Sequence, residues 1–127
     1  MSPFALLALL LCLPQAPPEG FAALSGRAAA ARDAGRTEEA VGAYRGALAL
    51  RADWDEGWWY LGALLYESKR CAEANAAFER FLALKPGAGP GWVMRGVCAF
   101  ELRDFASAID WLGKGTGLGL GGNAELQ

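Results

Sequence analysis

The sequence of 127 residues contains no histidine and only three cysteines. Histidine is the commonest general base and the commonest metal ligand, so its absence argues against acid–base catalysis and against metal binding. Cys71 and Cys98 each lack a second cysteine at ligand spacing, which excludes a zinc site. These two thiols could pair in an oxidising compartment, but the sequence favours two small buried apolar side chains. The sequence therefore indicates neither a metal nor a cofactor.

A dominant charge and a strand-forming composition are also missing. The formal net charge is −2, and both signs are mixed along the chain. Without a basic stripe, the chain lacks the electrostatic footprint of a nucleic-acid-binding protein, so nucleic acid is not expected as a partner. β-Branched residues are scarce and alanine is abundant, which favours helix over strand.

No segment is predicted to span a membrane. The N-terminal apolar run at residues 4–13 (FALLALLLCL) is shorter than the roughly 20 residues that a spanning helix needs. It fits the apolar core of a secretory signal peptide, although no Lys or Arg precedes it and a cleavage site is hard to place. We predict that residues 1–20 form a signal-like leader with a proline-rich linker, and that the protein is exported, periplasmic or secreted. A lipid anchor at Cys12, and an apolar helix packed on the following repeat in a cytoplasmic protein, are the alternatives.

What the sequence does contain is an internal repeat of constant period. Small residues recur at equal intervals in two series: Ala40, Ala74 and Ala108, and Ala28, Gly62 and Gly96. Large apolar residues recur at the same interval in two more: Leu24, Trp58 and Trp92, and Tyr44, Phe78 and Leu112. A fixed period of this length is the signature of a helical repeat array, in which each unit buries its apolar face against the next.

The 3.6-residue periodicity predicts two helices in each repeat. The expected helices cover residues 21–34, 37–50, 55–68 and 71–84, and two more begin near Gly89 and at Phe105. Thr37 is expected as the N-cap of the second helix. Because glycines crowd the end of the last helix, we expect it to fray after Gly113 or Lys114.

The second repeat resembles the tetratricopeptide repeat family, whose motif is W-x2-L-G-x2-Y, then A-x3-F, then P. The matching residues are Trp58, Leu61, Gly62, Ala74, Phe78 and Pro86, with Leu65 in place of the tyrosine. The resemblance implies an all-α fold, a right-handed α-α superhelix of three stacked helix-turn-helix repeats. The repeats would occupy residues 21–54, 55–88 and 89–120, followed by a loose tail at 121–127.

The structural core follows from the same series of residues. Gly62 and Gly96 should let the two helices of a pair approach closely, and bulky side chains should fill the remaining space. The expected core residues are Trp58, Leu61, Gly62, Ala74, Phe78, Trp92, Gly96 and Ala108. An uncapped last helix would also leave an apolar face open, through which copies of the chain could associate.

In proteins similar to this one, the first helix of each repeat lines a concave groove that binds other proteins. Carried over, the resemblance places these residues in the groove: Arg32, Trp59, Tyr60, Tyr66, Val93, Met94, Val97 and Phe100. Glutamates stand at its rim: Glu56, Glu67 and Glu101. Such an aromatic and apolar groove would suit an extended peptide or an amphipathic helix of a protein partner. The basic clamp that one subclass uses for chaperone tails is absent.

The sequence therefore predicts a non-catalytic protein-interaction module. One alternative is a structural part of a longer repeat array without an independent function. An enzyme is disfavoured, because the only candidate acid–base pair is Glu67 and Glu101, which are more simply explained as solvated surface residues.

Overall fold

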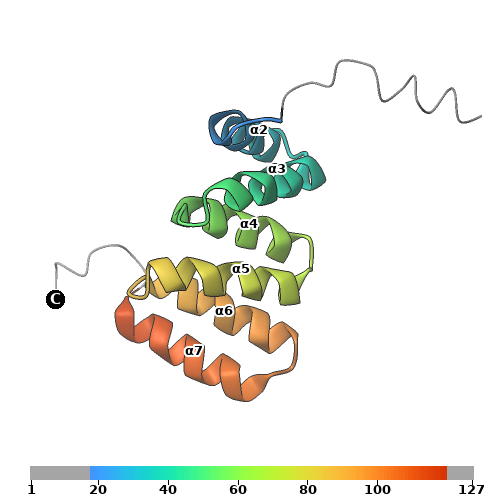
Figure 1. Ribbon diagram of the computed structural model, residues 1–127. Helices are drawn as coiled ribbons and strands as arrows, with labels where there is room; N and C mark the ends of the chain where they lie inside the picture. Colours follow the sequence, from blue (N-terminus) through green and yellow to red (C-terminus); the bar gives the residue numbers. More distant parts are fainter. Residues whose placement is uncertain (1–17, 120–127) are drawn as a thin grey trace, which may run out of the picture.

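The computed structural model describes residues 18–119 and shows six α-helices and no strand within that range. The helices are α2 (Phe21–Asp33), α3 (Thr37–Leu50), α4 (Asp55–Glu67), α5 (Cys71–Leu84), α6 (Gly89–Glu101) and α7 (Phe105–Leu118). They stack in chain order, with α2 and α7 at opposite ends (Figure 1). The predicted all-α solenoid is therefore confirmed. The leader, its cleavage and the tail at 121–127 lie outside the described residues.

The two helices of each repeat are joined by a turn with one residue in the left-handed conformation. Gly35 (φ 74°), Lys69 (φ 61°) and Arg103 (φ 63°) occupy this position, one in each repeat and at equal intervals. A backbone hydrogen bond closes each turn, as in the 2.9 Å bond from the Arg70 amide to the Leu65 carbonyl. This arrangement satisfies carbonyl groups that the helix end would otherwise leave unpaired. The turns thus lie where the predicted helix ranges leave room for them, as between residues 55–68 and 71–84.

The prediction that Thr37 is the N-cap of the second helix was wrong, although the helix spans the expected residues 37–50. Arg36, not Thr37, is the N-cap of α3, and no side chain caps this end. The Arg36 amide donates to the Ala31 carbonyl at 2.8 Å, which closes the preceding turn. The chain can therefore enter the helix at once, and Thr37 is already its first residue. Glu38 and Glu39 lie in the first turn, as expected.

Glycine and a bulky side chain interlock within each of the last two helix pairs. A Cβ atom added at Gly62 would lie 2.8 Å from the Phe78 ring, and one added at Gly96 would lie 2.6 Å from Leu112 Cγ. Both distances are too short for a real Cβ contact. Phe78 itself has no exposed surface. The predicted close approach is therefore present in both pairs.

Leu61, Ala74 and Ala108 are buried as predicted, but the repeated tryptophans lie closer to the surface. Trp58 and Trp92 are half-buried, and their indole N–H groups donate to the carbonyls of Ala52 (2.8 Å) and Pro86 (2.9 Å). Each tryptophan thus ties the start of the first helix in its repeat to the preceding loop, in addition to its apolar packing.

The last helix does not fray at Gly113 or Lys114; it continues to Leu118. Gly115 is buried, and a Cβ there would lie 2.8 Å from the Val93 amide nitrogen and 2.9 Å from the Gly89 carbonyl oxygen. The glycine therefore allows backbone-to-backbone contact between α6 and α7, and this packing offsets its low helix propensity. The prediction of fraying considered only the low helix propensity of glycine and not the packing of α7 against α6.

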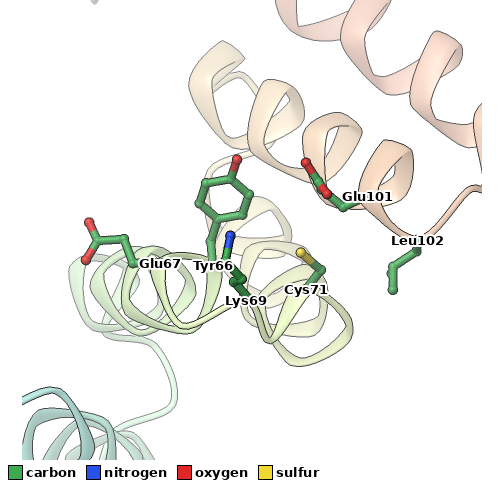
Figure 2. A pocket seen from close by; sticks show the side chains of 6 residues that line it. All are labelled: Tyr66, Glu67, Lys69, Cys71, Glu101 and Leu102. Atoms are coloured by element: carbon green, nitrogen blue, oxygen red, sulfur yellow. The ribbon is translucent and has the colours of Figure 1, made fainter.

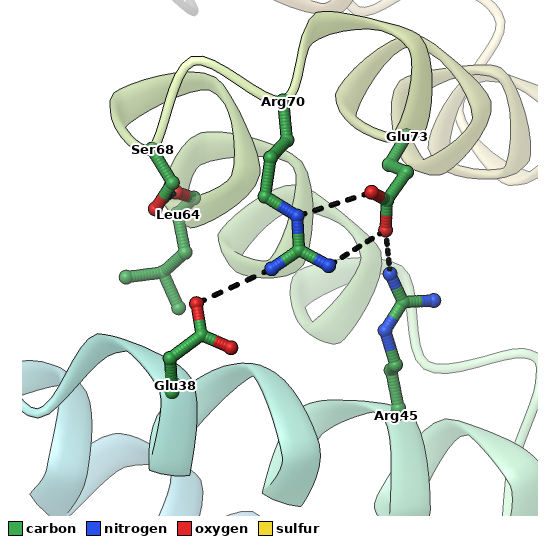
Figure 3. Close-up of polar contacts among 6 residues, drawn as sticks. All are labelled: Glu38, Arg45, Leu64, Ser68, Arg70 and Glu73. Atoms are coloured by element: carbon green, nitrogen blue, oxygen red, sulfur yellow. Dashed lines mark hydrogen bonds and ion pairs between the residues drawn. The ribbon is translucent and has the colours of Figure 1, made fainter.

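A network of ion pairs joins the first repeat to the second (Figure 3). Arg70, just before α5, contacts Glu73 at 2.9 Å and Glu38 of α3 at 3.3 Å. Arg45 of α3 contacts Glu73 at 2.7 Å. The hydrogen bonds from Arg70 and the charge of Arg45 lower the pKa of the Glu73 carboxyl. The network thus holds α3 and α5 together at the surface.

Candidate functional site

The first helices of the three repeats, α2, α4 and α6, carry the predicted groove residues. Three sets of equivalent positions, each with one member in every repeat, form what we call the A-helix face. It comprises Ala29, Ala63 and Val97, then Arg32, Tyr66 and Phe100, then Asp33, Glu67 and Glu101. All nine residues are exposed or half-buried. The face is therefore accessible along α2, α4 and α6.

A hollow of 320 Å³ opens at the α4–α6 part of this face. It is lined by Tyr66, Glu67, Lys69, Cys71, Glu101 and Leu102. Figure 2 shows Tyr66, Lys69 and Cys71 on one side, and Glu101 of α6 and the following Leu102 on the other. The hollow thus combines a phenol ring, a thiol and an alkyl side chain with charged groups at its edge.

Carboxylates dominate the charge at the edge of the A-helix face. Asp33 pairs with Arg32 at 3.1 Å, but Glu67 and Glu101 form no ion pair within residues 18–119. Lys69 is the single cation in the lining of the hollow. Within this hollow, two carboxylates against one ammonium leave an excess of negative charge, which favours cationic groups on a partner. Arg103 lies in the adjoining hollow with Glu101 and Phe100.

Among the predicted groove residues, Arg32 is held by its own neighbours. Its guanidinium donates to the Tyr44 hydroxyl at 2.7 Å and lies over the Tyr60 ring, 3.8 Å from the centroid. Partial burial acts to lower the pKa of Arg32, but the hydrogen bond to Asp33 and nearby groups outweigh it, so that the pKa is raised. Burial raises the pKa of the Tyr44 hydroxyl, and the Arg32 charge opposes this shift. Arg32 therefore stays cationic and mainly orders the first repeat.

Several other predicted groove residues are engaged in packing. The Trp59 ring lies between Phe78 and Phe81, with centroids 5.4 and 5.3 Å away. Tyr60 stacks on Tyr44 at 6.0 Å. Aromatic contacts of this geometry stabilise a core. Trp59 and Tyr60 thus present at most one edge to a partner.

On α6, some of the predicted groove residues are also engaged in packing, and others are accessible. Val93 lies against Gly115 of α7, and Met94 packs against the buried core. Phe100 is 58% exposed and contacts Phe105 edge-on, with 5.5 Å between the ring centroids. Val97 is half-buried. Phe100 and Val97, together with Tyr66 of α4, are therefore the apolar groups most available for binding.

Sequence reasoning missed Lys69, Cys71 and Leu102 as parts of the hollow. The available signal was the repeat register, which places Lys69 at the same turn position as Gly35 and Arg103. A turn between two helices of one repeat stands beside the end of the first helix of the next. Residues of this turn should therefore have been added to the predicted groove.

A second hollow, of 410 Å³, lies on the opposite helices, between α3 and α5. Its lining includes Trp58 and Leu61, with Arg45 and Arg80 at its sides. The Arg80 guanidinium stands 5.1 Å from the Trp58 ring centroid, and Arg45 is already paired with Glu73. These contacts make the second hollow part of the junction between repeats rather than a free site.

Within residues 18–119, no group of three or more His, Cys, Asp or Glu side chains is placed to hold a metal ion. Glu67 and Glu101 share the hollow, but no buried polar side chain stands behind them in the described part of the chain. None of the described helices combines the length and the apolar character needed to cross a membrane.

The fold defines a helical-repeat protein. The family model described as tetratricopeptide repeat matches residues 27–89 and again 61–114, and the chain therefore belongs to the tetratricopeptide repeat family. No protein with a curated description matches the sequence significantly.

Solved structures share this fold at low sequence identity. A crystal structure of MamA is similar with a TM-score of 0.72 and 18% identity, over 78% of this chain and 58% of that chain. A chain of the CopN–Scc3 complex gives 0.72 and 14%, over 77% and 58%. The complex of the TPR2B domain of yeast Sti1 with pHsp70 gives 0.69 and 16%, over 84% and 82%. The chain thus spans less than two thirds of the length of the MamA structure, and these similarities show the fold alone.

Proposed function

We propose that the protein is a non-catalytic interaction module that holds a segment of a partner protein on its A-helix face. The observation that carries the proposal is the hollow lined by Tyr66, whose glutamates are unpaired among the described residues, together with the 58%-exposed Phe100 in an adjoining hollow that also contains Glu101. Exposed aromatic side chains next to a concavity are typical of binding hot spots. The similar structures that contain complexes, of CopN with Scc3 and of Sti1 with pHsp70, are consistent with such a role.

The chemistry of the face specifies the segment. Tyr66, Val97 and Phe100 favour apolar side chains, and the free carboxylates of Glu67 and Glu101 favour Lys or Arg beside them. An extended peptide or one face of an amphipathic helix can present both kinds of group at the spacing of the repeats. A carboxylate-terminated ligand is disfavoured, because Arg32 is already paired and the other cations beside the face, Lys69 and Arg103, lie next to Glu67 and Glu101.

The proposal can be tested by selecting binders from a random-peptide phage library with the full chain. We expect the selected peptides to combine apolar residues with Lys or Arg. A Tyr66→Ala, Phe100→Ala double variant should bind them at least about tenfold more weakly, because both side chains are truncated within the contact. Trp59 is a poor choice for this test, since its truncation would also loosen the packing around Phe78.

Leu50→Ala is the matched control, since Leu50 is a comparably exposed apolar side chain on α3 and does not belong to the A-helix face. It should leave the affinity unchanged. Cys71 provides a second readout, because it lines the hollow and a bound peptide should slow its alkylation. Selected peptides that bind the double variant as tightly as the wild type would place the site elsewhere.

A further inference from the structure

The outer face of α7 is exposed at positions that are covered in the other repeats. Ile109 is 75% exposed, whereas its equivalent in α3, Val41, is 4% exposed beneath α4. The equivalent in α5, Asn75, accepts a hydrogen bond of 2.9 Å from Arg95 of α6. Phe105 of α7 is likewise 48% exposed. The α7 face therefore has the form of a surface that a first helix of a following repeat would cover.

The opposite end of the stack shows the complementary face. In α4 and α6, the residues that meet the preceding repeat are buried, as with Leu64 and Cys98. Their equivalent in α2 is Ala30, which is exposed, and the neighbouring positions of the same face are exposed as well. That face consists of Ala23, Gly26, Arg27 and Ala30. It has the form of a surface that would cover a preceding repeat.

The contacts between α5 and α6 show how the two end faces would meet. Arg95 of α6 reaches Asn75 of α5, and Gly91 lies against Leu82. Carried one repeat forward from α5 to α7 and two repeats back from α6 to α2, the same register sets the exposed face of α2 against the outer face of α7. The resulting pairs are Ala30 with Phe105, Arg27 with Ile109, Gly26 with Leu112, and Ala23 with Thr116. Two of these pairs, Ala30 with Phe105 and Gly26 with Leu112, set a small residue against a bulky one, as interlocking helices require. In a third pair, the alkyl part of Arg27 would lie on Ile109.

We propose that a second copy of this chain covers the α7 face with its α2 helix, so that copies stack head to tail. The contact continues the junction that already joins α3 to α4 and α5 to α6. Because the two faces differ, the contact is heterologous and is free to propagate into an open filament. A single helix-on-helix junction buries little area, so the association should be weak and concentration-dependent. This inference goes beyond the proposed function and does not depend on it.

Two charge variants of the full chain test the proposal. Ile109→Lys blocks the α7 face and Ala30→Glu blocks the α2 face; both positions are exposed, so circular dichroism and melting should match the wild type. In sedimentation velocity over about 10 µM to 1 mM, the wild type should grow with concentration, and each variant alone should stay monomeric. Leu50→Lys, at an exposed apolar residue outside both faces, should behave as the wild type.

The decisive sample is a 1:1 mixture of the two variants. Ala30→Glu retains its α7 face and Ile109→Lys retains its α2 face, so the mixture should form dimers and stop there. A wild type that remains monomeric over the whole range would overturn the proposal. Self-association of Ala30→Glu alone would also overturn it, since that result would mean that two α7 faces meet each other.

Discussion

The second and third repeats share one backbone plan but fill it by opposite means. In the second repeat, α4 and α5 are held by aromatic rings, with Trp59 between Phe78 and Phe81. In the third, Gly96 packs against Leu112 as Gly62 packs against Phe78, but Gly115 adds a contact between backbone atoms of α6 and α7. The comparison teaches that the same helix pair can be filled by aromatic rings or by closer approach of the helices, provided that no space is left.

The largest effect should come from removing the aromatic filling. Phe78→Ala leaves a cavity in a fully buried site and should lower the free energy of unfolding by about 3–5 kcal/mol. Leu112→Ala, at the equivalent position of the third repeat, should cost less than half as much because Leu112 is only half-buried. Urea unfolding monitored by circular dichroism measures both values. Equal losses would break the distinction between the repeats.

The close contact of α6 with α7 at Gly115 should be sensitive to an added side chain, whereas the aromatic packing is sensitive to a removed one. Gly115→Ala places a Cβ against the backbone of Gly89 and Val93 and should destabilise by about 1–3 kcal/mol. Gly113→Ala is the matched control on the same helix, because nothing lies within 4 Å of its Cβ position. It should stabilise by about 0.5–1 kcal/mol through helix propensity. If both variants were stabilised, the close contact of α6 with α7 would be wrong.

Cys98 is buried at the junction between the second and third repeats, and its thiol should therefore react slowly. Burial, with a smaller effect of Cys71, raises the pKa of Cys98 from 9.0 to about 12. Since each pKa unit is tenfold, Cys98 should carry about a thousandfold less thiolate than an unperturbed cysteine. We expect iodoacetamide at pH 8 to modify Cys71 in the native protein well before Cys98, as peptide mass spectrometry can measure.

The raised pKa of Cys98 also makes the stability of the protein depend on pH in the alkaline range. Because the folded pKa of Cys98 is raised, its contribution is fully present below the unfolded value of 9.0 and is lost as pH rises above it. Cys98→Ala should flatten the fall in melting temperature between about pH 9 and pH 11. An unchanged alkaline profile would show that the thiol is not buried at this junction.

The smallest effect belongs to the ion pairs at the junction between the first and second repeats, where they are exposed and add to buried aromatic contacts. The pKa of Glu73 is lowered in the folded state, so its contribution is present above its usual value of 4.5 and is lost as pH falls through the folded value. Glu73→Gln should therefore leave the melting temperature nearly unchanged at pH 7 and reduce its acid dependence. Glu56→Gln is the control for charge removal, because Glu56 is exposed, lies in the first turn of α4 as Glu73 lies in that of α5, and forms no ion pair within residues 18–119.

The fold could be predicted from the sequence because the repeat is encoded by residues that act through local shape. Gly62, Ala74 and Phe78 must be small or large where two helices cross, and this requirement recurs with the period of the repeat. The fraying of α7 was wrongly predicted because Gly115 is unfavourable locally and favourable in the tertiary packing. Thr37 was misplaced because the preceding turn is closed by the backbone, without a side-chain cap.

The candidate site was harder to predict, since periodicity places a residue on a helix but does not say which neighbours occupy it. Trp59 and Tyr60 have the composition of a binding surface, yet their rings are stacked on Phe78 and Tyr44. Tyr66 and Phe100, one repeat apart on the same helix face, keep surface available to a ligand. Which of these aromatic residues are packed and which are available to a ligand depends on contacts between α4 and α5 and between α3 and α4.

The most direct test of the binding role is the affinity of a selected peptide, measured by isothermal titration calorimetry, for the wild type and for the Glu67→Gln, Glu101→Gln double variant. If the A-helix face holds an apolar segment flanked by Lys or Arg, the double variant should bind more weakly, and the salt dependence of binding should decrease. Equal affinity and an unchanged salt dependence in the double variant would contradict binding at this face.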